Sequence, residues 1–572
     1  MRKKRRETER QAPPARPAPR RAWPYALAVL AALLATLEAY GPALGGPFLF
    51  DDLYLPFTRP GLAEAPLSVW LAGVRPLLML SFWLNFRLSG LEPFSYHLFN
   101  VLAHFLVSLL VLLIARRLLA LAGVEGGRRE LLSVFAGAMF LFHPVQTESV
   151  AYVASRSETL SGMLFYAALA LFLYRRSQAV SWPMAAGVLV LYAAAVSTKE
   201  HTAALVALLA LTDYFWNPGF SLQGLRRNWR LYAPLALAAP AAARFIWNVV
   251  STSDSAGFGI RQFTWDQYFF TQCRAIWVYL RLFFLPYGQN LDYDFPISRN
   301  ALEHGAIFGL AGLVALTAMA VVYRRRYPLA AYGWLAFLLL LAPTSSVIPI
   351  LDPIAERRLY LALPGLLLVS LELLRRWRIA PARLGAVLGL ALIVAAALAW
   401  SRNKVWAGPI ALWQDTVAKS PRKARPHFQL AYAYYQEGRC AGAVDEYAQA
   451  ARLAPPDYRL LVDWALACDC AGQPEEALAK LRQAAALEKS AHVYSLIGMV
   501  YGKQRRRAEA LAALEAAAQL DPRYEMTFVY RGNLYASLGE MEAAAREYRH
   551  ALSLNPHSQP AADGLALVEA RR

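Results

Sequence analysis

Long apolar runs alternate with short arginine clusters from Trp23 to Trp400. Runs of about 20 residues with few charges are long enough to cross a bilayer as helices. After residue 405 these runs stop, and the chain becomes Ala-rich, charged and soluble in character. The pattern predicts an all-α protein in two parts: a polytopic helical membrane domain over 23–405 and a soluble domain over 406–572.

The arginine clusters set the expected topology, because Lys and Arg concentrate in cytoplasmic loops. Placing every cluster inside gives about 11 spans, an inside N-terminus and an outside C-terminus. Residues 1–22 are basic and Pro-rich, and we expect a disordered cytoplasmic arm there. The expected spans cover about 23–40, 97–115, 131–143, 158–174, 182–198, 201–216, 231–249, 302–323, 328–342, 359–374 and 381–400.

Residues 250–301 are ambiguous, because 268–286 is long enough to cross the membrane. A crossing there would place Arg324–Arg326 outside, against the charge rule. We therefore interpret 250–301 as one outer loop that contains a membrane-embedded or surface helix.

The soluble part is repetitive. Ala443, Ala477, Ala510 and Ala544 recur at spacings of 34, 33 and 34, and a second Ala follows each one seven residues later. This spacing is typical of tetratricopeptide repeats, which stack helix pairs into a solenoid with a concave groove. The expected repeats are 424–457, 458–490, 491–524 and 525–558, with a capping helix over 559–572. The groove is expected to bind a protein or peptide, and a solubilising or oligomerising stalk is the alternative.

Two of the four cysteines are expected to lie close together in the stacked repeats. Cys440 falls at the turn of the first repeat and Cys470 ends the first helix of the second. An outside compartment allows oxidation, so we predict a Cys440–Cys470 disulfide, with Cys468 as a competing partner.

The net charge of +19 raises the question of nucleic-acid binding. The charge is divided among short clusters between apolar runs, which is the arrangement that membrane topology requires. No Gly-x-x-x-x-Gly-Lys-Ser/Thr loop, no Gly-x-Ser-x-Gly and no paired Cys/His zinc spacing occurs in the sequence. Nucleic-acid binding and ATP-driven transport are therefore not predicted.

The candidate chemistry lies in the outer segments, where acids and bases are mixed. Asp51 and Asp52 follow the first span directly, and charged groups at membrane depth usually face a cavity. Such a cavity suits an anionic lipid-linked donor: arginines hold phosphate, and a carboxylate takes the proton of an acceptor hydroxyl. The candidate binding residues are Arg75, His143, Glu148, Arg156, Glu158, Lys199, Glu200, Glu356, Arg357, Arg358 and Tyr360.

Several of these residues have a structural alternative. The four-residue spacing of Glu148, Tyr152 and Arg156 predicts one helical face, which could equally carry a structural ion pair. Lys199 and Glu200 could pair locally at a helix end. A metal site from Asp51, Asp52 and His143 is conceivable, but the spacing does not require one. Glu356–Arg358 could anchor a span at the interface, and His97 and His201 are expected to be interfacial.

Several motifs together resemble those of the transmembrane and tetratricopeptide repeat-containing O-mannosyltransferases. The resemblance covers nearly the whole chain after residue 23, and the order of membrane domain and repeats is part of it. The motifs are Phe50-Asp51-Asp52, Arg75-Pro76-Leu77, Asn85, Tyr96-His97, the run from His143 to Ala151, Ser155-Arg156-Ser157-Glu158, Lys199-Glu200, the run from Leu291 to Pro296, and the run from Ala355 to Tyr360.

The resemblance implies a GT-C-type glycosyltransferase domain over 23–405 that uses a polyprenyl-phosphate-linked sugar at the non-cytoplasmic face. It implies Asp51 as the base, Asp52 as an orienting group, and Arg75, Arg357 and Arg358 near the lipid phosphate. It also implies inversion at the anomeric carbon and no metal or other cofactor. The basic, Ala-rich composition is typical of a bacterial chain, so the expected location is the inner membrane with the repeats in the periplasm.

The sequence thus predicts transfer of mannose or another hexose to Ser/Thr hydroxyls of proteins that the repeats bind. Two alternatives remain. One is a transferase that modifies a lipid or surface polysaccharide and uses the repeats as an assembly scaffold. The other is a non-catalytic membrane scaffold or transporter.

Overall fold

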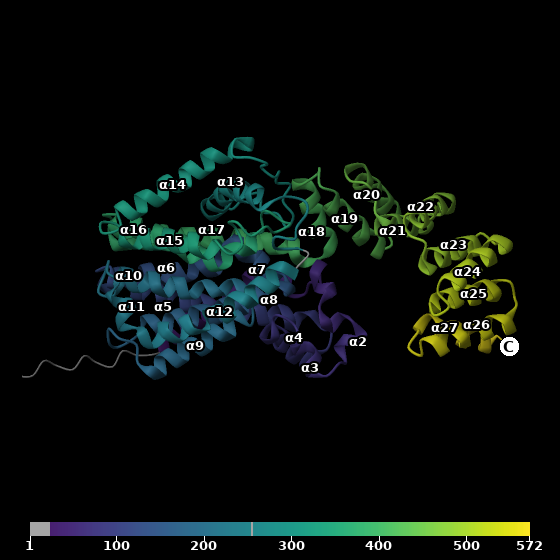
Figure 1. The fold of residues 1–572 in the computed structure, drawn as a ribbon, viewed down its shortest axis with the longest axis horizontal. Coiled ribbons are helices and arrows are strands. Elements are labelled where there is room, and N and C mark those ends of the chain that lie inside the picture. The colour runs from purple at the N-terminus through teal and green to yellow at the C-terminus, as the bar shows by residue number, and fades with distance from the viewer. Residues whose placement is uncertain (1–22, 253–254, 572) are drawn as a thin grey trace, which may run out of the picture.

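A computed structural model describes residues 23–252 and 255–571 of the chain. The predicted basic arm 1–22 lies outside the described residues. Within the described ranges the chain is helical, and a bundle of long helices is followed by a curved arm of short helix pairs (Figure 1). The expected all-α fold is confirmed.

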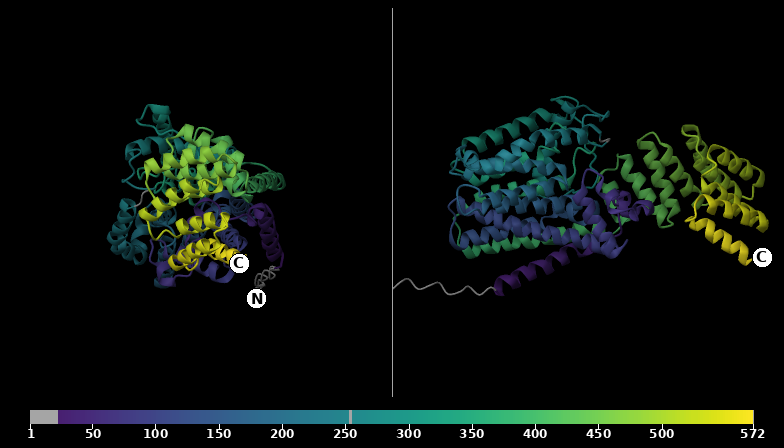
Figure 2. Two further views of the ribbon diagram at one scale, coloured as in Figure 1. Left: turned by 90° about the vertical axis from the view of Figure 1, so that its right-hand side faces the viewer. Right: turned by 60° about the horizontal axis from the view of Figure 1, so that its bottom comes forward.

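The long helices of the bundle run roughly side by side along the long axis of the molecule (Figure 2). They are α1 (Trp23–Leu44), α5 (Pro93–Leu121), α6 (Gly126–Phe142), α8 (Arg156–Leu173), α9 (Trp182–Val196), α10 (Leu205–Trp216), α12 (Trp229–Thr252), α14 (Ala306–Val322), α15 (Pro328–Leu341), α16 (Leu359–Arg376) and α17 (Pro381–Asn403). Five of the described helical segments are long and apolar enough to cross a membrane, and α9 and α15 are shorter apolar helices. The chain is a helical membrane protein, and the number of about 11 spans stays a prediction.

Short helices connect the long ones. They are η1 (Phe50–Tyr54), η2 (Pro56–Thr58), α2 (Pro60–Ala63), α3 (Leu67–Leu71), α4 (Pro76–Ser89), η3 (Pro144–Gln146), α7 (Thr147–Ala151), η4 (Val153–Ser155), η5 (Glu200–Ala204), α11 (Gln223–Arg227), α13 (Trp265–Phe284), η6 (Glu303–Gly305), η7 (Glu356–Arg358) and η8 (Lys404–Ala407). All of them except α11, η5 and η6 lie in segments that the expected topology assigns to the outer side, and η5 and η6 overlap the starts of the expected spans 201–216 and 302–323.

Small residues let the bundle helices approach closely. A Cβ added at Gly333 of α15 would lie 2.3 Å from the carbonyl oxygen of Gly365 on α16. Contacts of this kind between backbones are favoured in membrane helices, where lipid offers no hydrophobic force to drive association. These two helices form part of the core that positions the outer loops.

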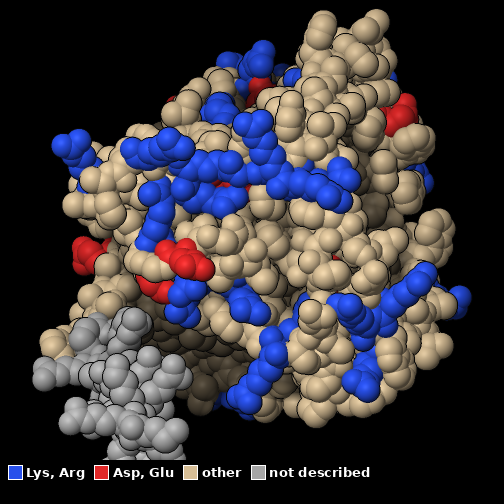
Figure 3. Space-filling model, turned by 90° about the vertical axis from the view of Figure 1, so that its left-hand side faces the viewer, with Lys and Arg blue, Asp and Glu red and all other residues tan. Residues whose placement is uncertain are grey.

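The arginine clusters meet at one end of the bundle, and Figure 3 shows Lys and Arg gathered there. Arg375 in the last turn of α16 donates to the carbonyl of Ala122, just after α5, at 3.0 Å. Arg128 at the start of α6 donates to Leu374 O at 2.7 Å, and Arg175 after α8 pairs with Asp213 of α10 at 2.9 Å. We refer to this as the inner end, and to the opposite end, next to the repeats, as the outer end.

Helix α13 begins and ends at the outer end. Near its start, the Tyr268 hydroxyl donates to Thr344 O at 2.7 Å. At its last turn, Nε2 of His143 lies 2.9 Å from Phe283 O. Thr344 and His143 both lie just beyond the outer ends of bundle helices, so both ends of α13 are at the outer end of the bundle. That 250–301 forms an outer loop stays a prediction.

The curved arm consists of α18 (Pro409–Lys419), four helix pairs and a last helix. The pairs are α19 (Ala424–Gln436) with α20 (Cys440–Leu453), α21 (Tyr458–Cys470) with α22 (Pro474–Leu487), α23 (Ala491–Lys503) with α24 (Arg507–Leu520), and α25 (Glu525–Ser537) with α26 (Met541–Leu554), followed by α27 (Gln559–Ala570). The first residues of the pairs coincide with the starts of the expected repeats. A Cβ at Gly498 would lie 2.5 Å from Leu514 Cγ, which explains the small residue in that repeat.

A disulfide joins Cys440 at the start of α20 to Cys470 at the end of α21, with a Cα–Cα distance of 5.7 Å. This distance is within the usual range for a disulfide. Cys468 is free and buried. The predicted pairing is confirmed, and the competing pair with Cys468 is not formed.

Candidate functional site

The acidic pair lies in the short turn η1 at the outer end. Asp52 is buried, and its carboxylate accepts from the backbone N–H of Leu49 at 2.9 Å and of Ala154 at 2.6 Å. Burial raises the pKa of Asp52 to about 8, against the opposite effect of these two N–H groups. Asp52 therefore holds the turn against the segment that precedes α8.

Asp51 is the exposed member of the pair. Its backbone N–H donates to the Tyr152 hydroxyl at 2.8 Å, so the turn is fixed on both sides of the exposed carboxylate. Burial raises the pKa of Tyr152, the charges of Asp52 and Asp51 raise it further, and the Arg357 charge acts in the opposite direction. Tyr152 thus lies within electrostatic reach of both the acidic turn and Arg357.

Three ion pairs at the outer end join segments that are far apart in the sequence. Arg75, at the start of α4, makes two parallel bonds to Glu200 at 2.8 and 2.9 Å. Arg357 of η7 donates to Glu148 of α7 at 2.5 Å. The third pair joins Lys199 to Glu158 of α8. The charges of Glu200, Glu158 and Arg357 all act on Arg75, so these pairs lie near one another, and their role in one site stays a prediction.

The members of these pairs differ in exposure. The side chains of Glu148 and Glu158 are 3% and 4% exposed, whereas those of Arg75 and Arg357 are 40% and 30% exposed. Glu148 neutralises Arg357 and Glu158 neutralises Lys199 from the buried side of each pair. The guanidinium groups of Arg75 and Arg357 remain partly accessible. Exposed guanidinium groups held in place by a carboxylate are suited to bind phosphate oxygens.

The pKa shifts follow the same arrangement. Burial alone would raise the pKa of Glu200, but the bonds and the charge of Arg75 outweigh it, so the pKa is lowered. Burial would lower the pKa of Arg357, and the charge of Glu148 raises it. Burial lowers the pKa of Lys199, because the desolvation penalty exceeds the attraction of Glu158.

The predicted common helical face of Glu148, Tyr152 and Arg156 is wrong. Helix α7 ends at Ala151, Tyr152 is extended with φ −81° and ψ 120°, and η4 separates it from α8. Spacing by four residues places side chains together only within one continuous helix. Glu148 consequently pairs with Arg357, and the alternative of a Glu148–Arg156 ion pair is also wrong.

Arg156 is enclosed by neutral groups. Its guanidinium lies 4.4 Å from the ring centre of Phe82 and 4.3 Å from that of Phe99. It donates to Asn85 Oδ1 at 2.7 Å and to Asn100 Oδ1 at 3.2 Å. Two aromatic faces and two amides account for this buried cation, so its contacts are structural and join α4, α5 and α8.

The alternative of a local Lys199–Glu200 pair is wrong, because each residue pairs elsewhere: Lys199 with Glu158 and Glu200 with Arg75. His201, expected at the interface, lies beside Glu158, with its Nε2 3.5 Å from Glu158 Oε2.

Three other candidate residues have interior or backbone partners. Both ring nitrogens of His143 face backbone groups, Val145 N and Phe283 O. The Tyr360 hydroxyl is buried and lies 3.0 Å from His104 Nδ1. Arg358 donates to Pro353 O at 2.8 Å and to Asp352 O at 2.6 Å. These contacts stabilise the loops around the ion pairs, and a substrate role for these side chains stays a prediction.

Glu356 holds the long outer loop. It accepts from Asn290 N at 2.6 Å and from the hydroxyl of Tyr293 at 2.7 Å. Burial raises the pKa of Glu356, and its hydrogen-bond donors lower it only in part. The acid of the Glu356–Arg358 motif therefore fixes the long outer loop, at Asn290 and Tyr293, to η7.

The contact between the outer loops and the repeats was not anticipated. Asp292 accepts two bonds from Arg425, at 2.5 and 2.6 Å, and is also paired with Lys423. Arg425 also reaches Asp352 at 2.7 Å. The signal in the sequence is the run from Lys419 to Arg425, a basic cluster in a part of the chain that the topology places outside.

The repeats also touch the acidic turn itself. Arg459 of α21 donates to the hydroxyl of Tyr54 at 3.0 Å, and Trp413 of α18 packs edge-on against Phe50 with ring centres 5.4 Å apart. The exposed Asp51 therefore lies between two residues that contact the repeat arm.

The fold and the site define a class: a helical membrane protein whose outer loops are docked to a tetratricopeptide-repeat arm. A family model described as "Tetratricopeptide repeat" matches residues 491–524 and 531–558, which confirms the repeat prediction there. Two solved repeat proteins are similar at 19% identity: MamA, covering 26% of this chain and 86% of that one with a TM-score of 0.23, and YrrB, covering 31% and 88% with a TM-score of 0.24.

Particular relatives also match. The chain is 34% identical over 152 residues to the human protein O-mannosyl-transferase TMTC3, a match that covers 26% of this chain and 15% of the relative. It is 33% identical over 183 residues to human TMTC1, covering 28% and 19%. It is 36% identical over 140 residues to Drosophila melanogaster Tmtc1, covering 24% and 15%. The expected resemblance to this family is confirmed, and the matches span less than a fifth of each relative's length.

Proposed function

We propose that this protein is a membrane glycosyltransferase that moves a sugar from a polyprenyl-phosphate-linked donor to hydroxyl groups of a protein acceptor. The observation that carries the proposal is the exposed Asp51 at the same outer end as two partly exposed arginines, Arg75 and Arg357, each paired with an acid. Tyr152, which bonds to the Asp51 backbone, lies within electrostatic reach of both Asp51 and Arg357. The relatives named as protein O-mannosyl-transferases favour mannose or another hexose as the sugar.

In the proposed reaction Asp51 takes the proton of a Ser or Thr hydroxyl. The hydroxyl oxygen attacks the anomeric carbon, and the bond from that carbon to the phosphate oxygen breaks. The electron pair of that bond leaves with polyprenyl monophosphate. One direct displacement of this kind inverts the anomeric carbon.

Arg75 and Arg357 stabilise the leaving phosphate in this proposal. Charge-assisted bonds to phosphate oxygens are stronger than neutral ones, and negative charge develops on the phosphate as the sugar departs. The two guanidinium groups supply positive charge where a metal ion would otherwise be needed, so the reaction as proposed requires no cofactor.

The repeat arm supports a protein acceptor in preference to a polysaccharide. Repeat solenoids present extended binding surfaces, and here the second repeat contacts the acidic turn through Arg459 and Tyr54. A polypeptide bound along the arm would lead to Asp51. The outer end would face the periplasm of a bacterial inner membrane.

The test is an incubation of the purified full-length protein with a polyprenyl-phosphate hexose and an acceptor protein that co-purifies with it. Intact-mass spectrometry should record the addition of one or more hexoses to the acceptor. Transfer to lipid or polysaccharide alone, with the acceptor protein unchanged, would contradict the protein-acceptor proposal.

A further inference from the structure

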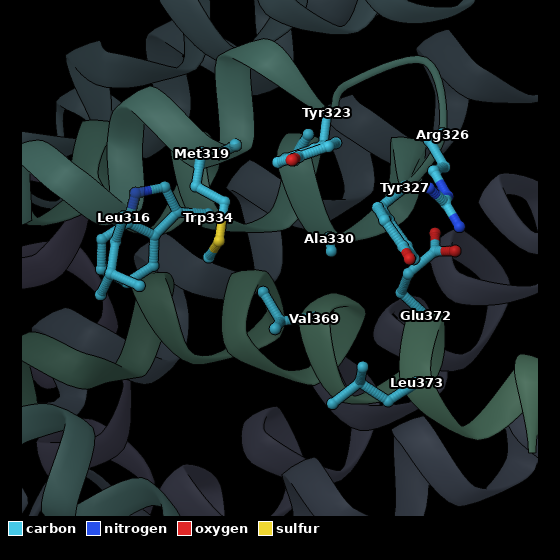
Figure 4. Close-up of a pocket in the computed structure, with 12 residues that line it drawn as sticks. Leu316, Met319, Tyr323, Arg326, Tyr327, Ala330, Trp334, Val369, Glu372 and Leu373 are labelled. Atoms are coloured by element: carbon cyan, nitrogen blue, oxygen red, sulfur yellow. The ribbon is translucent and has the colours of Figure 1, made fainter.

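A cavity of about 510 Å³ lies between α14, α15 and α16. Figure 4 shows that Leu316, Met319 and Trp334 line one part of it and that Ala330 lies near its centre. Val369 and Leu373 complete the apolar lining. The volume falls within the usual range of ligand sites, about 300–1,000 Å³.

The polar groups of the cavity gather toward the inner end of the bundle. They come from the inner ends of α14 and α16 and from the turn before α15, and they are Tyr323, Arg326, Tyr327 and Glu372. Figure 4 shows Arg326, Tyr327 and Glu372 close together. The cavity thus has an apolar body within the depth of the bundle and a polar mouth at its arginine-rich end.

The one acid of this lining is already neutralised. Glu372 Oε1 accepts from Arg375 at 2.7 Å and from Arg376 at 2.6 Å, while Oε2 accepts from Leu329 N at 3.0 Å. Two arginines on one carboxylate leave a net positive charge beside the mouth.

The other cations near the mouth lack acidic partners. Arg326 lines the mouth, lies over the Tyr327 ring and has no ion pair or side-chain hydrogen bond within the part of the chain that the structure describes. The neighbouring Arg325 is not part of the lining and lies over the Phe220 ring. Arg324 is held by the carbonyl of Val321 at 2.6 Å, and its Nε has no partner among the described residues. The mouth therefore carries a strong excess of positive charge.

Helix α14 is open to its surroundings. Only 11% of its candidate span is buried, and Val314 and Val322 are 59% and 69% exposed. In a membrane this helix faces lipid, so a lipid chain can reach the cavity beside it from the bilayer.

We propose that this cavity binds an anionic glycerophospholipid of the inner leaflet, with one acyl chain in the apolar body and the phosphate at Arg326, which lines the mouth. Basic pockets between membrane helices at the cytoplasmic side are suited to acidic headgroups, and the apolar lining matches an acyl chain. The site lies at the end of the bundle opposite Asp51, so it is separate from the proposed donor site and does not depend on the proposed function.

The test is native mass spectrometry of the full-length protein after exchange into detergent that contains phosphatidylglycerol or phosphatidylcholine. Wild-type protein should retain a phosphatidylglycerol adduct and little phosphatidylcholine. Ala330→Phe, which fills the cavity, and Arg326→Gln, which removes the cation of the mouth, should each reduce the adduct at least fivefold. Arg226→Gln, an exposed arginine in another inner loop, is the matched control and should retain it.

Ala330→Ser keeps the cavity open and should retain the adduct, which separates filling of the site from misfolding. Equal retention of both lipids would indicate non-specific annular lipid and overturn the proposal. An unchanged adduct in a folded Ala330→Phe protein would place the lipid elsewhere, and a dimer in place of the adduct would identify a second copy as the occupant.

Discussion

The two ends of the bundle carry similar residues in different arrangements. At the inner end, arginines outnumber acids and bind backbone carbonyls: Arg128 donates to Leu374 and Trp377, and Arg117 donates to Leu173. At the outer end, Arg75, Lys199 and Arg357 each pair with an acid from another segment.

We interpret the inner arginines as topology signals and the outer ion pairs as part of a site. Arginines near the carboxyl ends of helices are stabilised by the helix dipole and mark the cytoplasmic side. A buried carboxylate is costly unless it is paired, and both ends hold such pairs: Asp213 and Glu372 at the inner end, Glu148 and Glu158 at the outer end. The outer end differs because its pairs Arg75–Glu200 and Arg357–Glu148 join segments 125 and 209 residues apart and share that end with the exposed Asp51, so we expect the site there. Four predictions test this comparison, in order of decreasing effect.

The largest effect is expected from Arg357→Gln, which leaves Glu148 buried without its cation. Removing one partner of a buried pair costs about 3–5 kcal/mol. Thermal unfolding should therefore occur at a clearly lower temperature, and transfer should be lost.

The double substitution Glu148→Gln with Arg357→Gln is the control. It removes the unpaired charge, so most of the lost stability should return while transfer stays absent. Recovery of transfer in the double variant would show that Arg357 has no role beyond pairing with Glu148.

The second prediction concerns Asp52, whose pKa is raised to about 8 from an unfolded value of about 4. A raised folded pKa means that its contribution to stability is present below pH 4 and is lost as the pH rises toward 8. The unfolding free energy of wild type minus that of Asp52→Asn should fall by a few kcal/mol over this range. A difference that rises with pH would mean that the two backbone N–H groups keep Asp52 ionised.

The third prediction concerns the inner end. Arg128→Gln removes bonds to two carbonyls without exposing a buried acid, so it should cost about 1 kcal/mol and leave transfer unchanged. A loss comparable to that of Arg357→Gln, measured in the same unfolding experiment, would erase the distinction between the two ends.

The smallest effect on stability is expected from Tyr54→Phe, which removes only the bond to Arg459. Stability should change by less than about 0.5 kcal/mol. If the arm guides the acceptor, KM for a protein acceptor should rise several-fold while KM for a short hydroxyl peptide stays the same. An equal rise for both acceptors would place Tyr54 in the site rather than at the junction with the arm.

Much of the fold could be predicted from local patterns. Apolar runs and arginine clusters located the bundle helices, and the spacing of alanines located the repeats, because both depend on neighbouring residues. Cys440 and Cys470 could be paired because stacked repeats have a known geometry.

The partners of the charged residues could not be predicted in this way. Arg357 and Glu148 are 209 residues apart, and Arg75 and Glu200 are 125 apart. No rule based on sequence spacing predicts contacts over such separations. The four-residue spacing of Glu148, Tyr152 and Arg156 failed as well, because the helix ends before Tyr152. Arg156 shows the same limit, since only the packed structure reveals its enclosure by Phe82 and Phe99.

The central claim is that Asp51 is the base that activates the acceptor hydroxyl. The most direct measurement is the turnover of Asp51→Asn with a polyprenyl-phosphate hexose and an acceptor protein, beside wild type and with unfolding temperature and donor binding recorded for both. The account predicts a fall in kcat of about 10²–10⁴-fold, with stability and donor affinity unchanged. Transfer at the wild-type rate by the folded variant would contradict it.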